Sequence, residues 1–374
     1  MESNPFGLVY RKPADANKVG GRYLQNLCER YKQSQPQGQC DKSGEWLKAV
    51  TLADIMNAQA SKSLSAEGWN PNLKGEEKKA AAEKQLRSML ENPLAAVSDP
   101  RKLSWEPTIP ASGVIGSPID GYAAGMKPKP IVFGVNSDEG TLFAAAFYDS
   151  MKKYFTPENL RGAIDLAFAL QPGIPGKING TSRYKPTAGD QKPVPPGYGN
   201  VTAEAAANIM TDAVFICGNV RAMDNVLGQP LGSLKPIYGY LLDQPPYIDL
   251  YSLHGEHSDH GACEPSTGNV CHANELPYVF NQLYEDNDQG YRPVEGRGDE
   301  QLGSEMSKAW FDFASVKDAS DLPKSTRWIR YVKHGSEVRW IGGKDTPAPA
   351  NLDDEAHCSS IWLRTWLYPH ARTP

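Results

Sequence analysis

The run Ile131-Val132-Phe133-Gly134-Val135-Asn136-Ser137-Asp138-Glu139-Gly140 decides how this chain folds. Its first half is short, apolar and rich in β-branched residues, which predicts a buried strand over residues 131–135. Its second half, residues 136–140, is a polar turn at the carboxyl end of that strand. Functional side chains gather at this edge of α/β sheets, so the run indicates both a sheet and the place of a site.

Helices and strands alternate on either side of this run. Helices are predicted over residues 14–32, 46–59, 76–91, 157–171, 203–227, 304–315 and 361–368, and further strands over 236–242, 328–332 and 338–341. Thr156 is the expected N-cap of the helix that begins at Pro157. Residues 1–12 suggest the end of a strand, and the Pro- and Gly-rich residues 172–199 an exposed loop. The alternation predicts an α/β fold.

Composition narrows the classes of protein that the chain can belong to. Its 374 residues suffice for one large domain or two ordinary ones, and 40% hydrophobic with 22% charged residues is usual for a globular protein. A net charge of −5 gives no electrostatic reason to bind nucleic acid or an anionic membrane. No apolar run approaches the roughly 20 residues of a membrane helix. Residues 1–6 do not have the pattern of a signal peptide.

Six cysteines occur, at positions 28, 40, 217, 263, 271 and 358. Proximity in the sequence pairs 28 with 40 and 263 with 271, which leaves 217 for 358, but six buried thiols are an equal alternative. Paired cysteines would indicate an oxidising compartment. The triplets Asn179-Gly180-Thr181 and Asn200-Val201-Thr202 fit the N-glycosylation pattern, which also arises often by chance.

A histidine precedes a compact apolar turn in Cys271-His272-Ala273-Asn274-Glu275-Leu276-Pro277-Tyr278-Val279-Phe280. By its spacing alone, His272 is more often structural than catalytic. A carboxylate at a strand end and a later histidine, however, are two members of a nucleophilic triad. In α/β-hydrolases the order along the chain is Ser, Asp or Glu, then His, and Glu139 and His272 fit the last two places. No G-x-S-x-G elbow for the serine occurs in the sequence.

The same two stretches resemble the type-B carboxylesterase/cholinesterase family. Residues 134–140 are similar to its G-x-N-x-x-E-G motif, whose glutamate is the triad acid. Residues 272–280 resemble its H-G-x-E-[IL]-x-[FY]-V-F motif, whose histidine is the triad base, with Ala273 in place of the usual glycine. Further matches follow in family order: Pro118 to Gly121 resembles P-V-[IV]-D-G, Thr211 to Arg221 resembles T-D-x-x-F-x-C/x-P-x-R with Gly218 for proline, and Met306 to Ala314 resembles the M-x-x-x-W-x-x-F-A helix.

The resemblance implies the C-terminal portion of an α/β-hydrolase, with the N-terminal strands and the nucleophile elbow absent. Residues 1–374 would form a single, incomplete domain, in which Met1 is an internal methionine. Glu139 and His272 would be catalytic, a small-molecule ester the substrate, and no cofactor or metal is expected. The serine would come from a complementing N-terminal half or chain. The family places disulfides at Cys28–Cys40 and Cys217–Cys358, and the additional Cys263–Cys271 could brace the loop of the base. These disulfides suggest a secreted or periplasmic protein.

Other interpretations stay open. The chain could be a non-catalytic binding or adhesion module, as cholinesterase-like adhesion proteins are, or a truncated, inactive gene product. The dense cluster His254, His257, Asp259 and His260 could bind a metal, although a solvated loop at the rim of the site is favoured. Glu275 could support the base or make a structural hydrogen bond, and Asp212 is expected to pair with Arg221. The aromatic residues Tyr238, Tyr240, Tyr247 and Tyr251 could line a pocket, but core packing is favoured.

Overall fold

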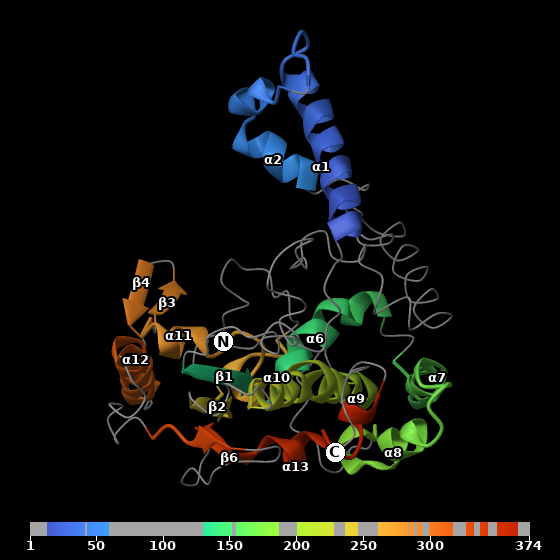
Figure 1. The fold of residues 1–374 in the computed structure, drawn as a ribbon, viewed down its shortest axis with the longest axis vertical. Coiled ribbons are helices and arrows are strands. Elements are labelled where there is room, and N and C mark those ends of the chain that lie inside the picture. Colours follow the sequence, from blue (N-terminus) through green and yellow to red (C-terminus); the bar gives the residue numbers. More distant parts are fainter. Residues whose placement is uncertain are drawn as a thin grey trace. The chain divides into compact units, whose positions relative to one another are not determined.

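A computed structural model describes residues 13–41, 43–59, 130–151, 155–186, 200–227, 236–245, 261–282, 284–287, 290–293, 299–316, 327–332, 337–342 and 350–365 (Figure 1). The chain divides into two compact units: one is Val9–Ser117, and the other comprises Met1–Leu8 and Pro118–Pro374. The single domain expected over residues 1–374 stays a prediction. Within the described ranges, no helix is long and apolar enough to cross a membrane.

The smaller unit contains a helical hairpin closed by a disulfide. Its elements are α1 (Pro13–Ser34), the 3₁₀ helix η1 (Glu45–Ala49) and α2 (Leu52–Gln59). The predicted bond between Cys28 and Cys40 is present. The helix expected over 46–59 is split, because Thr51 and Asp54 cap α2 reciprocally: Thr51 Oγ1 accepts from the Asp54 backbone at 3.1 Å, and Asp54 Oδ2 accepts from the Thr51 backbone at 3.0 Å.

The larger unit is built on a five-stranded mixed sheet. Its strands are β1 (Ile131–Asn136), β2 (Ile237–Leu242), β5 (Arg330–Tyr331), β6 (Glu337–Ile341) and β7 (Ala350–Asn351). β1, β2 and β6 run parallel, while β5 and β7 pair antiparallel with β2 and β6. The predicted core strands are therefore confirmed. The two-residue β7 and the separate hairpin of β3 (Tyr284–Asn287) and β4 (Gly290–Pro293) were not predicted.

Side chains alternate between the two faces of the sheet with the period of two that a strand imposes. One buried cluster receives Phe133, Val135, Ile237, Leu241 and Val338, and the other receives Val132, Tyr238, Tyr240, Leu242 and Ile341. Tyr238 and Tyr240 thus pack in the core, as the sequence favoured. Gly134 is paired with Tyr240 across the strands, and any Cβ at Gly134 would collide with the Tyr240 ring.

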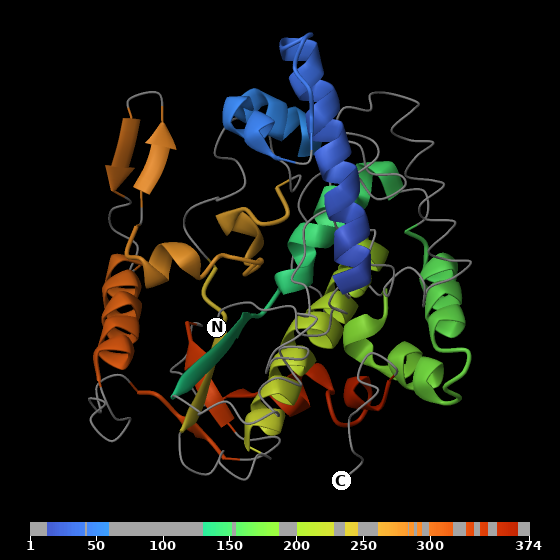
Figure 2. The same cartoon turned by 45° about the horizontal axis from the view of Figure 1, so that its top comes forward.

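Helices cover both faces of the sheet, as parallel strands require (Figures 1 and 2). The first cluster also contains residues of α7 (Pro157–Ala167), α8 (Ile174–Gly180), η2 (Ser182–Tyr184), η3 (Thr211–Ile216), α10 (Cys217–Leu227), α13 (Leu352–Ala356) and η8 (Trp362–Arg364). The second contains residues of α11 (Leu276–Val279) and α12 (Asp299–Ser315). α6 (Glu139–Met151) and α9 (Val201–Met210) pack against each other through small alanines.

Further predicted elements differ from the structure, and others lie outside the described residues. The segment expected to be an exposed loop over 172–199 contains α8 and η2, which bury Ile174, Ile178 and Tyr184. Of the helix predicted over 361–368, only the 3₁₀ turn η8 falls within the described residues. The predictions over 1–12 and 76–91 and the motif at 118–121 lie outside them.

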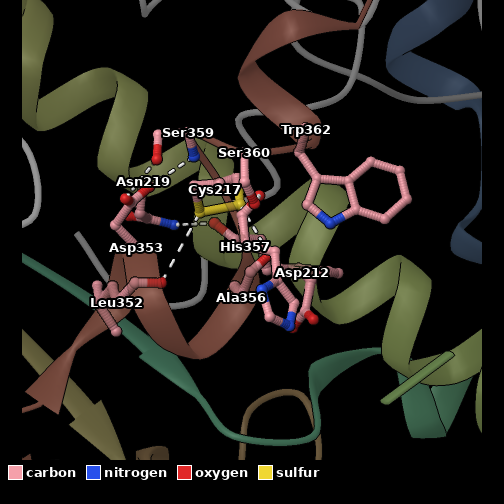
Figure 3. The surroundings of a disulfide bond; sticks show 12 residues. Asp212, Cys217, Asn219, Leu352, Asp353, Ala356, His357, Ser359, Ser360 and Trp362 are labelled. Atoms are coloured by element: carbon pink, nitrogen blue, oxygen red, sulfur yellow. Dashed lines mark hydrogen bonds between the residues drawn. A yellow bond between two sulfur atoms is a disulfide. The ribbon is translucent and has the colours of Figure 1, made fainter. Parts of the chain in front are cut away.

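The predicted long helix over 203–227 is continuous but contains the π-helical segment η3 between α9 and α10. Asp212 in η3 is fully buried, and its carboxylate accepts from Arg183 at 2.8 and 3.1 Å and from the Tyr184 hydroxyl at 2.8 Å. Arg183, rather than the expected Arg221, is thus its ion-pair partner. Trp362 donates to the Tyr184 hydroxyl at 2.8 Å. Figure 3 shows Asp212 and Trp362 close to the disulfide that joins α10 to the end of α13.

Candidate active site

Glu139 lies at the carboxyl end of β1, where the strand turns into α6. Its side chain is wholly buried, and both carboxylate oxygens are engaged. Oε1 accepts from the backbone N–H of Asn136 at 2.8 Å, and Oε2 lies 2.6 Å from Nδ1 of His272. The first bond fixes the carboxylate to the strand that carries it, so the second orients the imidazole against the sheet.

The loop that carries His272 is attached to the same strand end. Asp138 bonds Val270 twice, since its backbone N–H donates to the Val270 carbonyl at 3.1 Å and its Oδ2 accepts from the Val270 N–H at 3.0 Å. The carboxamide of Asn136 donates to the carbonyl of Cys271 at 2.8 Å. Three hydrogen bonds therefore hold the residues just before His272 to the end of β1.

The loop before His272 is also closed by its own disulfide, Cys263–Cys271, as predicted. Within it, Thr267 Oγ1 donates to the carbonyl of Ala262 at 3.1 Å, and Asn269 Nδ2 donates to the same carbonyl at 2.8 Å. Both cysteines are completely buried. A short covalent ring, hydrogen-bonded to the carbonyl of the residue just before it, restricts the backbone on the N-terminal side of the histidine.

After His272 the chain makes a tight turn into α11. Ala273 adopts a left-handed conformation with φ of 69°, a region that costs a residue with a Cβ roughly 1 kcal/mol more than glycine. The substitution noted in the sequence therefore falls where the backbone does favour glycine. The turn is completed by a hydrogen bond from the Asn274 N–H to the Cys271 carbonyl at 3.1 Å.

Two phenylalanine rings flank the imidazole of His272. Phe143 of α6 lies 5.3 Å from it between ring centroids, and Phe215 of the π-helical segment lies 5.2 Å from it. The two phenyl rings also stack on each other at 5.8 Å. They form an apolar wall that limits the rotation of the imidazole.

Glu275 is buried and accepts a hydrogen bond from the Asn136 carboxamide at 2.5 Å. Burial lowers the pKa of His272, but the hydrogen bond and charge of Glu139 and the charge of Glu275 outweigh it. The pKa of His272 consequently lies above its ordinary 6.5. Glu275 thus makes the structural hydrogen bond considered for it and also favours the protonated imidazole.

This arrangement can move a proton. Because Nδ1 is bonded to Glu139, Nε2 is the nitrogen that can exchange a proton with a reacting group. The His272 side chain is 29% exposed, so the ring is not sealed off from a substrate. The described residues contain no group of three or more His, Cys, Asp or Glu side chains that could bind a metal. The cluster His254, His257, Asp259 and His260 lies outside them.

The sequence brought Glu139 and His272 to attention, with Glu275 and the Cys263–Cys271 disulfide as possible supports, but missed further residues that hold them. Asn136 and Asp138 are polar residues of the turn after β1, where such contacts could have been anticipated. Phe143 lies one helical turn after Glu139 in α6, a helix that was not predicted. Phe215 could not be anticipated, because its position depends on the π-helical segment of a helix that was expected to be regular.

The chain matches the protein-family model described as the carboxylesterase family over residues 27–358. It is also similar to a protein named Crystal protein from Dictyostelium discoideum, with 25% identity over 225 residues. The aligned residues make up 60% of this chain and 35% of the Dictyostelium protein. The chain therefore spans about a third of the length of the curated relative that it matches.

Proposed function

The chain belongs to the carboxylesterase family, and we propose that it supplies the general base and the orienting acid of a serine esterase. The substrate class is carboxylic esters of small molecules. In this proposal His272 is the base and Glu139 is the acid. The observation that carries the proposal is the 2.6 Å contact between Glu139 Oε2 and His272 Nδ1 at a strand end.

In the proposed reaction, Nε2 of His272 removes the proton of a serine hydroxyl while the serine oxygen attacks the ester carbonyl. The protonated imidazole then donates this proton to the leaving alcohol, and an acyl-enzyme remains. Water attacks the acyl-enzyme in the same way and releases the acid. Glu139 keeps the imidazole in the required tautomer and stabilises its cation, and the charge of Glu275 adds to this stabilisation.

The serine in this proposal comes from outside the 374 residues, either from another part of a longer polypeptide or from a complementing chain. Two observations support it. The sequence has no G-x-S-x-G, the elbow that presents the nucleophile in α/β-hydrolases. The alignment with the Dictyostelium protein covers only 35% of that protein. We further propose that the protein is exported, because all six cysteines are paired in three disulfides.

A labelling experiment tests the assignment of the base. The chain is combined with the polypeptide encoded upstream of the Met1 codon and exposed to a fluorophosphonate, which labels only an activated serine. Labelling is expected with the natural chain and is lost with His272→Asn. The variant His357→Asn, at a histidine in another part of the larger unit, is the matched control and should leave labelling unchanged.

The same materials test the place of the nucleophile. The purified chain alone should show no turnover of p-nitrophenyl esters above background. Robust turnover by the chain alone that disappears in His272→Asn would place the nucleophile within the chain and overturn that part of the proposal. An upstream coding frame without a serine elbow would favour the alternative of a non-catalytic binding module.

A further inference from the structure

Two Asn-x-Thr triplets lie outside the proposed active site, and the structure separates them. Both fit the pattern at which N-linked glycans are attached, in proteins that pass through an export pathway. The first, at Asn179, lies near the end of α8, and the second, at Asn200, lies at the start of α9. Their side chains have opposite surroundings.

The side chain of Asn179 belongs to a partly exposed residue of α8. No hydrogen bond from the described residues reaches its carboxamide. Gly176 and Gly180, three residues before and one after, are exposed, and a methyl group at either would meet no atom within 4 Å. In both views α8 lies at the outer side of the larger unit, beside α7 (Figures 1 and 2).

The carboxamide of Asn200 is engaged at both ends. Its Oδ1 caps α9 by accepting from the N–H groups of Thr202 and Ala203 at 2.8 and 3.3 Å. Its Nδ2, the atom to which a glycan would be attached, donates to the carbonyl of Phe155 at 2.8 Å. The Thr202 side chain is itself buried, with 2% exposed. A glycan at Asn200 would separate the start of α9 from the residues that precede α7.

We propose that Asn179 carries an N-linked glycan and that Asn200 does not. In the transfer, Nδ2 of Asn179 forms a bond to C1 of a sugar whose bond to a lipid pyrophosphate breaks. The amide loses one proton and the pyrophosphate leaves. Transfer acts on the extending chain, before it has folded. Only a chain whose glycans are compatible with the folded structure can then fold and be secreted. The glycan at Asn179 projects from the end of α8, whereas one at Asn200 competes with the hydrogen bond from Nδ2 to the Phe155 carbonyl.

The test is site-specific glycan mapping of the full chain, produced behind a cleavable export signal in a eukaryotic secretory host. The folded, secreted protein is treated with peptide-N-glycosidase F in water enriched in heavy oxygen, which marks each formerly glycosylated asparagine as a labelled aspartate. The expected label is at residue 179 alone and only in the enzyme-treated sample, because the Asn179-Gly180 bond of an unglycosylated chain also deamidates spontaneously. A label at residue 200, or at neither residue, overturns the proposal.

Two matched variants test which asparagine carries the glycan while leaving the fold intact. Asn179→Gln should reduce the apparent mass by one glycan and leave the thermal midpoint nearly unchanged, because the side chain makes no hydrogen bond within the described residues. Asn200→Asp retains the Oδ1 acceptor that caps α9 and should leave the apparent mass unchanged. If Asn200→Asp instead removes a glycan, the proposal is wrong.

Discussion

At the scale of single residues, two carboxylates set the proton affinity of His272. Glu139 bonds Nδ1 directly, and Glu275 acts through its charge while its own oxygen is bonded to Asn136. Both act in a largely buried place, where charges interact more strongly than in water. The pKa of His272 therefore indicates whether Glu139 and His272 are in contact.

The variant Glu139→Gln should lower the pKa of His272, because it removes a charge and changes a charge-assisted hydrogen bond. The measurement is an NMR titration of the imidazole resonances. Glu305→Gln, at an exposed position of α12, is the control and should leave the titration in place. An unchanged pKa in Glu139→Gln would mean that the two side chains do not interact in solution.

The same shift makes stability depend on pH. The pKa of His272 is higher in the folded than in the unfolded chain, so its contribution to stability is complete below the unfolded value of about 6.5. It decreases as the pH rises through the folded pKa. The free energy of unfolding by urea should therefore fall by up to about 1.36 kcal/mol per pH unit between the two pKa values. His272→Gln should lack this component, and an identical pH profile in both proteins would refute it.

At the scale of elements, regular patterns were predictable from the sequence and local exceptions were not. β2 is a fully apolar run, β1 is apolar up to its last residue, Asn136, and α12 has clear helical periodicity, so all three were identified. α8 was missed because Pro175 and its two glycines resemble a loop, although Pro is favourable in a first helical turn. The π-helical segment has no periodicity of its own. The segment contains the buried Asp212, whose carboxylate is paired with Arg183 from another element. A pattern within one helix does not reveal such a pair.

Removing Arg183 should destabilise the larger unit, because it leaves the fully buried carboxylate of Asp212 with one fewer donor pair. Arg183→Met is expected to lower the free energy of unfolding by about 3 kcal/mol, the lower part of the range for a broken buried pair, since the Arg183 side chain is 33% exposed. Urea denaturation is the measurement. Adding Asp212→Asn should recover part of the loss, and two purely additive losses would show that the pair is not coupled.

At the scale of the whole molecule, the three disulfides constrain very different lengths of chain. Cys217–Cys358 spans 141 residues and Cys263–Cys271 spans 8. The chain-entropy relation gives about 5 kcal/mol for the long loop and about 2.5 kcal/mol for the short one. The pairing was predictable by proximity and resemblance, and so was the place of Cys263–Cys271 in the loop of the base.

The double variant Cys217→Ala/Cys358→Ala should therefore lose more stability than Cys263→Ala/Cys271→Ala, by roughly 2.5 kcal/mol. The two can be compared by urea denaturation under oxidising conditions. The short-loop variant should instead show the larger change at His272, seen as a broadened or shifted imidazole resonance. A larger change of the His272 resonance in Cys217→Ala/Cys358→Ala than in Cys263→Ala/Cys271→Ala would mean that the short ring does not position the base.

Asn136 also has a consequence for how the proposed enzyme tolerates motion. Its backbone bonds the acid, and its side chain bonds the loop of the base, so a displacement of the end of β1 moves both by the same amount. The distance between Glu139 and His272 is then expected to change little when the strands of the sheet shift slightly. In such an enzyme, the distance that varies would be the one between the serine hydroxyl and His272. The docking of the serine against this pair would determine that distance.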